Sequence, residues 1–292
     1  MLIIIGYLIT FGSVFGGFVL AGGHLFALFQ PLEFLMIGGA ALGAFLVGNN
    51  ISVIKNSLRM IYTTAISFGY NRKYYRELLS LMYELTEKIK KEGPLSIEED
   101  IESVDNSQIF QRYPLLKKDV EIVAFLKDYL RIIITGRVSP HQLEQLMDED
   151  IETFMNEKEQ PIHAINRVAD ALPAFGIVAA VMGIIHTMES MGGPPEQLGA
   201  LIAKALVGTF LGVLVGYGFV APIAMLLESK VNASVKALTA IKTILLASIN
   251  NLSPTIAVEF GRKTIHSIER PDGEELETIL KNIKQGEKAA NE

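Results

Sequence analysis

The residues of this chain that could do chemistry are few, and they match no common enzyme motif. The sequence has no P-loop, no HExxH, no G-x-S-x-G and no cysteine, so nucleotide hydrolysis, zinc-peptidase chemistry and Cys-based metal sites have no anchor. The five histidines are scattered, and only His186 falls in a long apolar segment. There it is either a polar group near the outer end of a membrane helix or part of a proton relay. We therefore expect no enzyme, no cofactor and no metal site.

Thr209 is the most informative polar residue, because it lies in an uncharged segment that covers residues 205–227. Its hydroxyl either bonds back to the carbonyl one turn earlier or lines a path for ions. A protein that moves ions through a bilayer usually holds an ionisable group near mid-depth. The apolar segments hold no internal carboxylate, and Glu33 and Asp170 are expected at their ends. If this chain forms part of an ion path, a partner must supply the titrating group.

Prolines and glycines in the apolar segments suggest how the helices bend and pack. Pro173 and Pro222 each remove one backbone hydrogen bond, so they are either simple kinks or hinges. Gly208, Gly212 and Gly216 recur every four residues and line one helix face, which would let a neighbouring backbone come close. Such a face predicts close helix packing but identifies no task.

The elements that must position these residues are membrane-spanning helices. Hydrophobic residues make up 50% of the 292 residues and the mean hydropathy is +0.34, which indicates an integral membrane protein with a sizeable soluble part. Uncharged segments suited to a bilayer core of about 30 Å cover residues 1–23, 34–54, 172–188 and 205–227. The predicted fold is all-α, with two membrane hairpins at 1–54 and 171–228.

The distribution of basic residues predicts the orientation. Every Lys and Arg except Lys204 lies between residues 55 and 167 or from 230 onward, and the connectors at 24–33 and 189–199 have none. Basic residues mark the cytoplasmic side of a membrane protein. We therefore expect both termini in the cytoplasm.

Two soluble parts follow from this topology. Residues 55–170 are predicted to form a large cytoplasmic helical domain between spans 2 and 3, and residues 229–292 a C-terminal helix and tail. Membrane lipid is the expected surrounding of the hairpins. The net charge of −6 offers no broad basic face for nucleic acid.

Helix-boundary signals indicate that the region between the hairpins is folded. Ser96 with Glu99 and Ser139 with Gln142 have the spacing of a capping box. Gly136 follows a run of apolar residues at helical spacing and is expected to end a helix.

Six segments carry a resemblance to a known family. They are FGSVFGG at 11–17, VGNN at 47–50, DYLR at 128–131, LPAFGIVAAVMG at 172–183, VGTFLG at 207–212 and IAVEFGRK at 256–263. In order and spacing they resemble the MotA subunits of flagellar motor stators, members of the MotA/TolQ/ExbB proton-channel superfamily. The resemblance extends over nearly the whole chain.

This resemblance implies a stator subunit of the bacterial flagellar motor in the inner membrane, with a role in motility and chemotaxis. The subunit would assemble as a ring, expected to be pentameric, around the transmembrane helices of a dimeric MotB-like B subunit. That partner would bring the ion-binding aspartate and the peptidoglycan anchor, in agreement with the missing carboxylate. Proton flow would then turn the ring and push on the rotor protein FliG.

The resemblance also implies roles for single residues. Pro173 and Pro222 match two prolines that are thought to couple ion binding to movement of the cytoplasmic part, and Thr209 matches a hydroxyl residue near the ion path. Glu98 matches an acidic residue that faces the rotor. Lys90 stands where better-known members have Arg, which keeps the charge but loses the planar donor fork. Without the resemblance, Lys90 and Glu98 would be solvated charges at helix ends.

The resemblance also bears on which ion drives the protein and on which member of the superfamily it is. Sodium-driven relatives resemble this chain but carry Thr where Ala180 stands, and a hard cation prefers oxygen ligands, so protons are favoured. The alternative function is an ExbB/TolQ-like energy-transducing subunit, but those relatives have three spans and an outside N-terminus. A purely structural scaffold is a third hypothesis, for which the glycine faces alone would suffice.

Overall fold

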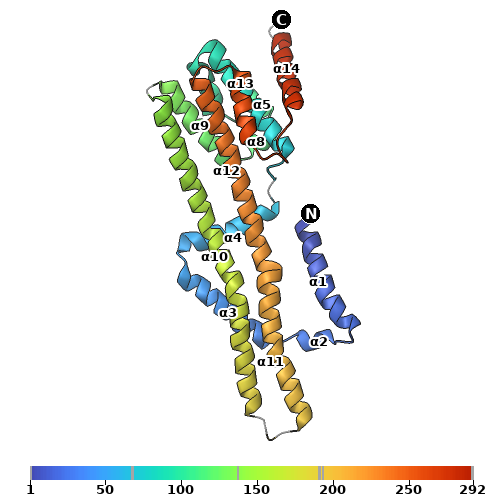
Figure 1. Cartoon of the computed structure of the whole chain (residues 1–292). Helices are drawn as coiled ribbons and strands as arrows, with labels where there is room; N and C mark the ends of the chain where they lie inside the picture. The colour runs from blue at the N-terminus through green and yellow to red at the C-terminus, as the bar shows by residue number, and fades with distance from the viewer. Residues whose placement is uncertain (1, 67–68, 137, 190–191, 193, 291–292) are drawn as a thin grey trace. The chain divides into compact units, whose positions relative to one another are not determined.

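A computed structural model describes residues 2–66, 69–136, 138–189, 192 and 194–290, and every regular element in these residues is a helix. The all-α prediction is confirmed (Figure 1). In chain order the elements are α1 (Leu2–Leu20), α2 (Leu25–Leu28), α3 (Pro31–Gly48), α4 (Ile51–Ile66), α5 (Arg72–Glu92), η1 (Pro94–Ile97), α6 (Glu98–Glu102), α7 (Gln108–Gln111), α8 (Pro114–Lys117), α9 (Val120–Thr135), α10 (Pro140–Met188), α11 (Pro195–Val215), η2 (Gly216–Val220), α12 (Ala221–Ile249), α13 (Pro254–Thr264) and α14 (Gly273–Ala290).

The chain divides into two compact units. The first contains Met1–Ile66 and Lys158–Glu228, and the second contains Ser67–Glu157 and Ser229–Glu292. Helices α10 and α12 each contribute residues to both units without a break. The segment boundaries predicted at residues 54 and 170 fall inside α4 and α10, so they mark changes of composition and not helix ends.

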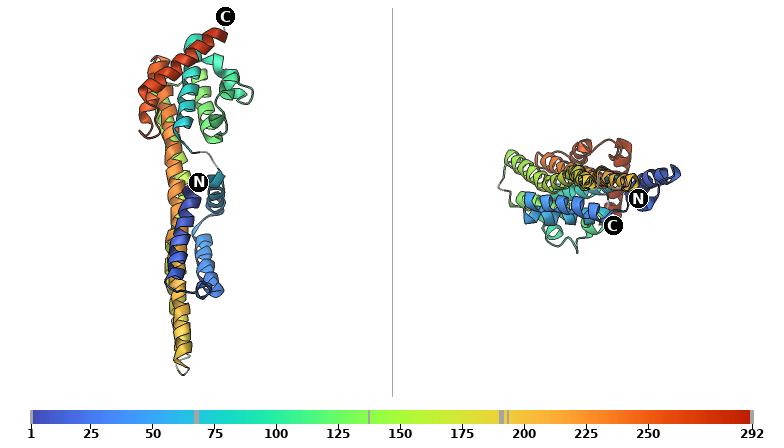
Figure 2. Two further views of the ribbon diagram at one scale, coloured as in Figure 1. Left: turned by 90° about the vertical axis from the view of Figure 1, so that its right-hand side faces the viewer. Right: turned by 90° about the horizontal axis from the view of Figure 1, so that it is seen from below.

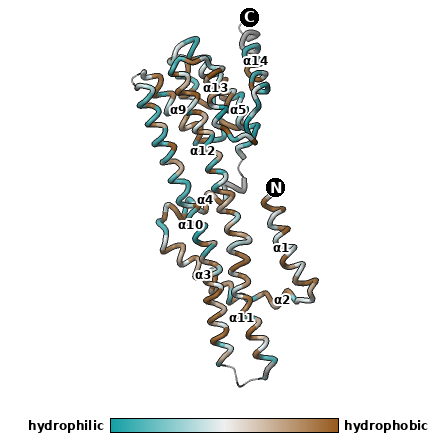
Figure 3. The backbone as a smooth tube through the Cα atoms, viewed as in Figure 1, coloured by the Kyte–Doolittle hydropathy of each residue, from teal (hydrophilic) through white to brown (hydrophobic). Residues whose placement is uncertain are grey.

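The first unit holds most of the apolar sequence. The described residues include 4 helical segments that are long and apolar enough to cross a membrane: Ile3–Leu20, Leu25–Gly48, and stretches within Pro140–Met188 and Glu196–Ile249. The prediction of four spans is thus confirmed. Hydrophobic residues dominate α1 and α11 in Figure 3, whereas the first half of α10 carries many hydrophilic ones.

The second membrane span is predicted to end near VGNN at 47–50, within the uncharged segment that runs on to residue 54. Helix α3 stops at Gly48, and Asn49 is extended at φ −136° and ψ 145°. The Asn50 side chain then accepts a hydrogen bond from the Val53 amide at 2.9 Å, which starts a new helix, α4. The end of the second span near VGNN is therefore confirmed, and the uncharged sequence that continues to residue 54 belongs to the next helix because the two asparagines interrupt the first one.

Helices α10 and α11 lie side by side in the first unit (Figures 1 and 2). Helix α3 packs on α11 in the same unit. The small core between these helices consists of Ile37, Ala41, Leu172, Ala179, Val207 and Leu211. Many large apolar side chains of α1 remain exposed, among them Leu8 at 66%, as expected for a surface that faces lipid or another subunit.

The second unit is built around α5, which buries a continuous run of side chains from Leu78 to Thr86. Asn71 caps the start of α5 by accepting from the Tyr74 amide at 3.1 Å. Side chains from α9, α12 and α13 complete one hydrophobic core with those of α5. This core explains why residues 67–157 fold together with residues beyond 229.

Two of the three predicted helix-boundary signals are confirmed. Gly136 ends α9 in the left-handed region at φ 65°, and Ser139 exchanges hydrogen bonds with Gln142 as a capping box. The prediction for Ser96 was wrong. Its hydroxyl donates to the Gly93 carbonyl at 2.7 Å, so it closes the preceding turn and does not cap α6.

Candidate functional site

Two periodic glycines of α11, Gly208 and Gly212, and the first residue of η2, Gly216, pack closely against α10. A Cβ built on Gly212 would lie 2.6 Å from the Leu172 carbonyl oxygen, and one on Gly216 would lie 2.5 Å from the Ala169 carbonyl oxygen. Real Cβ atoms do not approach backbone so closely, so any larger residue would push the helices apart. The two helix backbones can therefore approach closely at these levels because glycine has no side chain.

Ala180 and Thr209 lie at the level of Gly208 in the same helix pair. A Cβ on Gly208 would be 3.3 Å from the Ala179 Cβ and 3.5 Å from the Ala180 amide nitrogen. Ala180 is only 7% exposed, so α10 and its neighbours already cover it within the single chain. Thr209 is partly buried. The structure thus brings together the two residues that the resemblance assigned to the ion path.

The carboxylate of Glu33, which the sequence predicts at the end of an apolar segment, also lies near Gly208. Glu33 lies in the first turn of α3, is 8% exposed, and its Oε2 atom has no hydrogen-bond partner among the described residues. A Cβ on Gly208 would lie 2.8 Å from that oxygen. Glu33 does lie at a helix end as predicted, but it points into the packing between α3 and α11. The signal that could have found it is a glutamate two residues after the proline that opens an apolar helix.

The two prolines flank an irregular part of the helix pair. Gly216 begins a π-helical turn, η2, that ends one residue before α12, and Pro222 is the second residue of α12. A Cβ on Gly216 would lie 2.9 Å from Cδ of Pro173, so the proline of α10 packs where the π turn begins. A proline cannot donate to the carbonyl four residues earlier, and a π turn is one way to absorb that mismatch. The sequence predicted both prolines but not the π turn between them.

Helix α1 also contacts the π turn. The Tyr7 hydroxyl donates to the Phe219 carbonyl oxygen at 2.8 Å, and the two rings stack with centroids 5.2 Å apart. A π turn leaves backbone carbonyls without their usual helical partners, and here a side chain supplies the donor. The first span is thus attached to the irregular part of the fourth.

Lys90 and Glu98 lie in the second unit, at opposite sides of a tight connection. Lys90 is in the last turn of α5, which ends at Gly93 with φ 88°, and Glu98 opens α6 after the short helix η1. Both side chains are exposed. Within the described part of the chain neither forms an ion pair, whereas the neighbouring Lys88 pairs with Asp100 at 2.8 Å. The two charges are therefore free to interact with a partner.

The IAVEFGRK segment forms a structural ion pair. Arg262 is 7% exposed and donates from Nε and Nη2 to the two carboxylate oxygens of Glu259, both at 2.7 Å. Its Nη1 donates to the Pro271 carbonyl oxygen at 2.8 Å. The hydrogen bonds from Arg262 hold the pKa of Glu259 below its ordinary value. The pair fixes α13 to the segment that leads into α14.

A second carboxylate of this unit, Asp119, is shifted in the opposite direction. It caps α9 through the Ile122 amide and accepts hydrogen bonds from the hydroxyls of Tyr70 and Tyr74, each at 2.9 Å. Burial raises the pKa of Asp119, and the bonds from the tyrosines offset part of that rise. Asp119 thereby ties the start of α9 to the start of α5.

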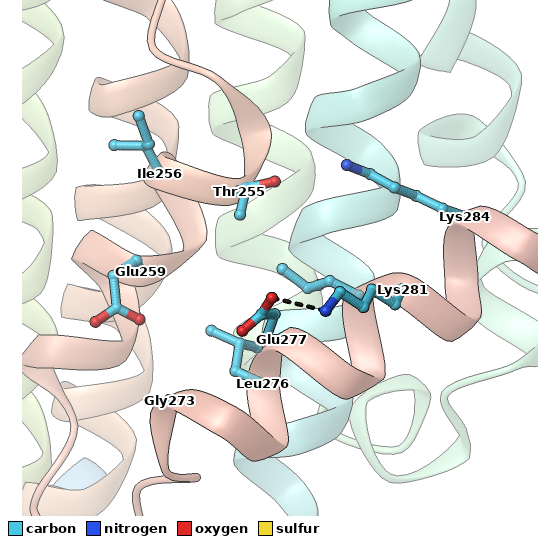
Figure 4. Close-up of a pocket in the computed structure, with 9 residues that line it drawn as sticks. Thr255, Ile256, Glu259, Gly273, Leu276, Glu277, Lys281 and Lys284 are labelled. Atoms are coloured by element: carbon cyan, nitrogen blue, oxygen red, sulfur yellow. Dashed lines mark ion pairs between the residues drawn. The ribbon is translucent and has the colours of Figure 1, made fainter.

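A cavity of about 440 Å³ lies between α13 and α14, and Figure 4 shows residues that line it. Ile256, Leu276 and Leu280 form its apolar lining, and Glu277 and Lys281 form an ion pair at 2.8 Å. Ligand sites usually present convergent polar groups that are free to bind. Here the lining carboxylates are already paired. Among the described residues, no three His, Cys, Asp or Glu side chains gather as a metal site either.

Four apolar spans, a glycine-packed helix pair with an irregular turn, and a helical soluble unit together define a multi-pass helical membrane protein. Residues 4–93 match the family described as Motility protein A N-terminal, and residues 117–240 match the MotA/TolQ/ExbB proton channel family. The chain is similar to Motility protein A of Salmonella typhimurium, with 47% identity over 97% of this chain and 96% of the relative. Chemotaxis protein LafT of Vibrio parahaemolyticus is 36% identical over 94% and 97% of the two chains.

The chain belongs to the Motility protein A family, and the expected resemblance to MotA is confirmed. Two solved structures share its fold. The C. jejuni MotAB structure aligns with a TM-score of 0.79 and 18% identity over 93% of this chain and 98% of that chain. The flagellar MotAB stator complex from Bacillus subtilis aligns with a TM-score of 0.73 and 24% identity over 88% and 92%. The protein is a multi-pass protein of the inner membrane.

Proposed function

We propose that this chain is the A subunit of a bacterial flagellar stator, which forms a proton channel with a B subunit and converts ion flow into torque. The observation that carries the proposal is the 47% identity to a motility protein over almost the full length of both chains. The same match covers the spans, the soluble unit and the C-terminal segment, so no large part of the chain is left for another task.

The proposed partner is a MotB-like B subunit. Both solved neighbours are named as MotAB, which supports a two-component assembly. The B subunit would supply the ion-binding aspartate and a peptidoglycan anchor, since the uncharged segments of the spans hold no carboxylate and Glu33 lies in the first turn of α3. The A subunits would form a ring around it, expected to be pentameric, with their exposed apolar faces against lipid and one another.

The proposed ion path runs past Thr209 and Ala180. The two residues lie at one level of the α10–α11 pair, next to Gly208. The methyl group of Ala180 offers no ligand to a hard cation, so the path suits protons, which need only the partner's carboxylate and a hydrogen-bonded route. The coupling ion is therefore proposed to be H⁺.

Pro173 and Pro222 are proposed to couple proton binding to motion. Pro173 packs on the first residue of the π turn, and Pro222 follows that turn by two residues. Helices bend most readily where the regular hydrogen-bond ladder is already interrupted. A change at the ion path could then be passed along α10 and α12, both of which continue into the soluble unit.

The soluble unit and the C-terminus are proposed to be cytoplasmic, because every Lys and Arg except Lys204 lies between residues 55 and 167 or from 230 onward, and the connectors at 24–33 and 189–199 have none. With two spans before residue 55, the N-terminus is proposed to lie on the same side. This orientation lets Lys90 and Glu98 meet the rotor protein FliG. Their exposure and lack of ion-pair partners within the described residues support such a contact.

The alternative is an energy-transducing subunit of the ExbB/TolQ kind, whose family shares the match at residues 117–240. The additional match at residues 4–93 is to the Motility protein A N-terminal family, and that favours the stator.

The deciding experiment measures the rotation of tethered, stator-null cells that express this chain with its cognate B subunit. Sustained rotation in sodium-free medium at fixed membrane potential is expected. Rotation that stops without sodium would keep the stator function and overturn the proton assignment. No rotation in either medium would favour the ExbB/TolQ-like alternative.

A further inference from the structure

An aliphatic pocket lies beside Lys90. It has a volume of about 400 Å³ and is formed where the C-terminal ends of α5, α9 and α12 meet the start of α10. Its most buried members are Leu143 and Leu245, at 2% and 1% exposure. Its partly buried members are one polar residue, Ser248, and five aliphatic ones: Ile89, Ile132, Ile133, Ile249 and Leu252. The pocket therefore extends from the surface to the hydrophobic core of the soluble unit.

The exposed members of the same lining show where the pocket opens. They are Lys90, Pro94, Gly136, Val138 and Asn251. Among the described residues of the lining, Lys90 is the ionisable one, and it forms no ion pair with any other described residue. The described part of the opening thus combines apolar and polar surface with the positive charge of Lys90.

An exposed lysine alone is a weak basis for a contact that must carry force. Ion pairs at a solvated surface contribute little affinity, and a lysine cannot form the bidentate pair that an arginine forms with a carboxylate. Affinity at protein interfaces comes mainly from apolar side chains that fill preformed pockets, while rim charges steer and orient the partner. The pocket beside Lys90 could receive an apolar side chain of the partner and so add the affinity that a solvated ion pair does not provide.

We propose that this pocket receives one apolar side chain from an amphipathic helix of the rotor partner. Lys90 then pairs with a carboxylate three or four residues away on that helix, the spacing that places two side chains on one helix face. This inference rests on the proposed rotor contact at Lys90 and adds to it an apolar anchor with a defined location. The occupant is accordingly a helix that carries an aliphatic or aromatic residue next to an acid.

The test fills the pocket from its opening. Val138 is 38% exposed, so Val138→Trp can place its ring over the pocket without replacing a core side chain. The matched control is Val120→Trp at the other end of α9, where Val120 is 75% exposed and lines no part of the pocket. The measured quantity is the Kd between the purified stator complex and the rotor protein, with the rotation speed of tethered cells as a second readout.

Val138→Trp is expected to raise this Kd about tenfold, the factor for loss of one buried aliphatic contact, and to slow rotation, whereas Val120→Trp does neither. If Lys90→Glu weakens binding but Val138→Trp behaves like Val120→Trp, the pocket proposal is overturned and the rotor contact stands. If neither Lys90→Glu nor Val138→Trp weakens binding, the rotor contact at Lys90 fails as well.

A photocrosslinking variant separates the possible occupants and does not depend on affinity. With p-benzoylphenylalanine at position 138 in assembled motors, an adduct with the rotor protein supports the proposal. An adduct with a second copy of this chain, or loss of ring assembly in Val138→Trp, would instead make the pocket a contact between subunits and overturn it.

Discussion

Gly208 of α11 leaves the space in which the carboxylate of Glu33 is buried. A Cβ at position 208 would lie 2.8 Å from the Glu33 Oε2 atom, and that oxygen has no hydrogen-bond partner among the described residues. A polar atom buried without a partner costs free energy, so such an arrangement is retained where it serves a purpose. Changes at either residue should therefore alter the stability of this level of the helix pair in a measurable way.

The first prediction concerns this pair directly. Gly208→Ala should destabilise the complex, because the new methyl group meets the Glu33 carboxylate and the Ala179 side chain. The double variant Gly208→Ala with Glu33→Ala should recover part of the loss, since it removes the nearest of the two obstacles. The thermal midpoint of the purified complex measures both effects. Equal thermal midpoints for the single and double variants would show that the Glu33 side chain does not limit the size of the residue at position 208.

The second prediction separates a side-chain obstacle from a backbone obstacle. Gly212→Ala places a methyl group 2.6 Å from the Leu172 carbonyl oxygen, and backbone cannot rotate away. We expect a loss of about 1–3 kcal/mol, the usual effect of overpacking, with no recovery on addition of Glu33→Ala. Gly199→Ala on the same helix is the control, because nothing lies within 4 Å of a Cβ there. A midpoint for Gly212→Ala as high as for the control would contradict the close packing of α10 and α11.

Local patterns carried most of the fold prediction. Apolar length gave four spans, the four-residue spacing gave the glycine face, and Gly136 and Ser139 marked helix ends through bonds to near neighbours. The errors came from features that depend on distant parts of the chain. The burial of Glu33 needs α11, and the π turn at Gly216 needs α10 and α1 packed against it. The local sequence around Glu33 and Gly216 does not indicate which distant helices pack there.

The third prediction concerns pH. Hydrogen bonds from Arg262 lower the pKa of Glu259 in the folded state below its ordinary value of 4.5. A lowered folded pKa means that the pair stabilises the fold above the unfolded pKa and that this contribution is lost as the pH falls through the folded pKa. Glu259→Gln should therefore destabilise α13 at neutral pH, by about 1 kcal/mol because the carboxylate is partly solvated. Hydrogen exchange of the α13 amides measures it. The difference from wild type should vanish in acid, and a difference that persists there would mean that packing and not charge is responsible.

The fourth prediction tests the hinge. Pro173→Ala restores a backbone amide inside α10 while leaving the contact partner Gly216 in place, so the helix should stiffen without loss of fold. We expect complexes that assemble with the B subunit in normal amounts but rotate slowly or stall. Pro161→Ala, at the other proline inside the same helix, is the control and should rotate faster than Pro173→Ala. Absence of the Pro173→Ala protein from the membrane would assign Pro173 a folding role instead.

The fifth prediction tests the rotor contact at Glu98. This side chain is exposed at the first residue of α6 and forms no ion pair within the described residues, so reversal of its charge should leave the fold intact. Glu98→Lys is expected to impair swimming while the protein reaches the membrane at normal levels, because like charges then meet across the interface. A compensating reversal of the partner charge on FliG should restore part of the motility. Glu102→Lys is the comparison variant. Glu102 already pairs with Arg131 at 2.8 Å, so its replacement breaks a contact within this chain, and the compensating FliG variant should not restore motility.

Normal swimming of Glu98→Lys would remove Glu98 from the contact and leave Lys90, with the pocket beside it, as the remaining candidate.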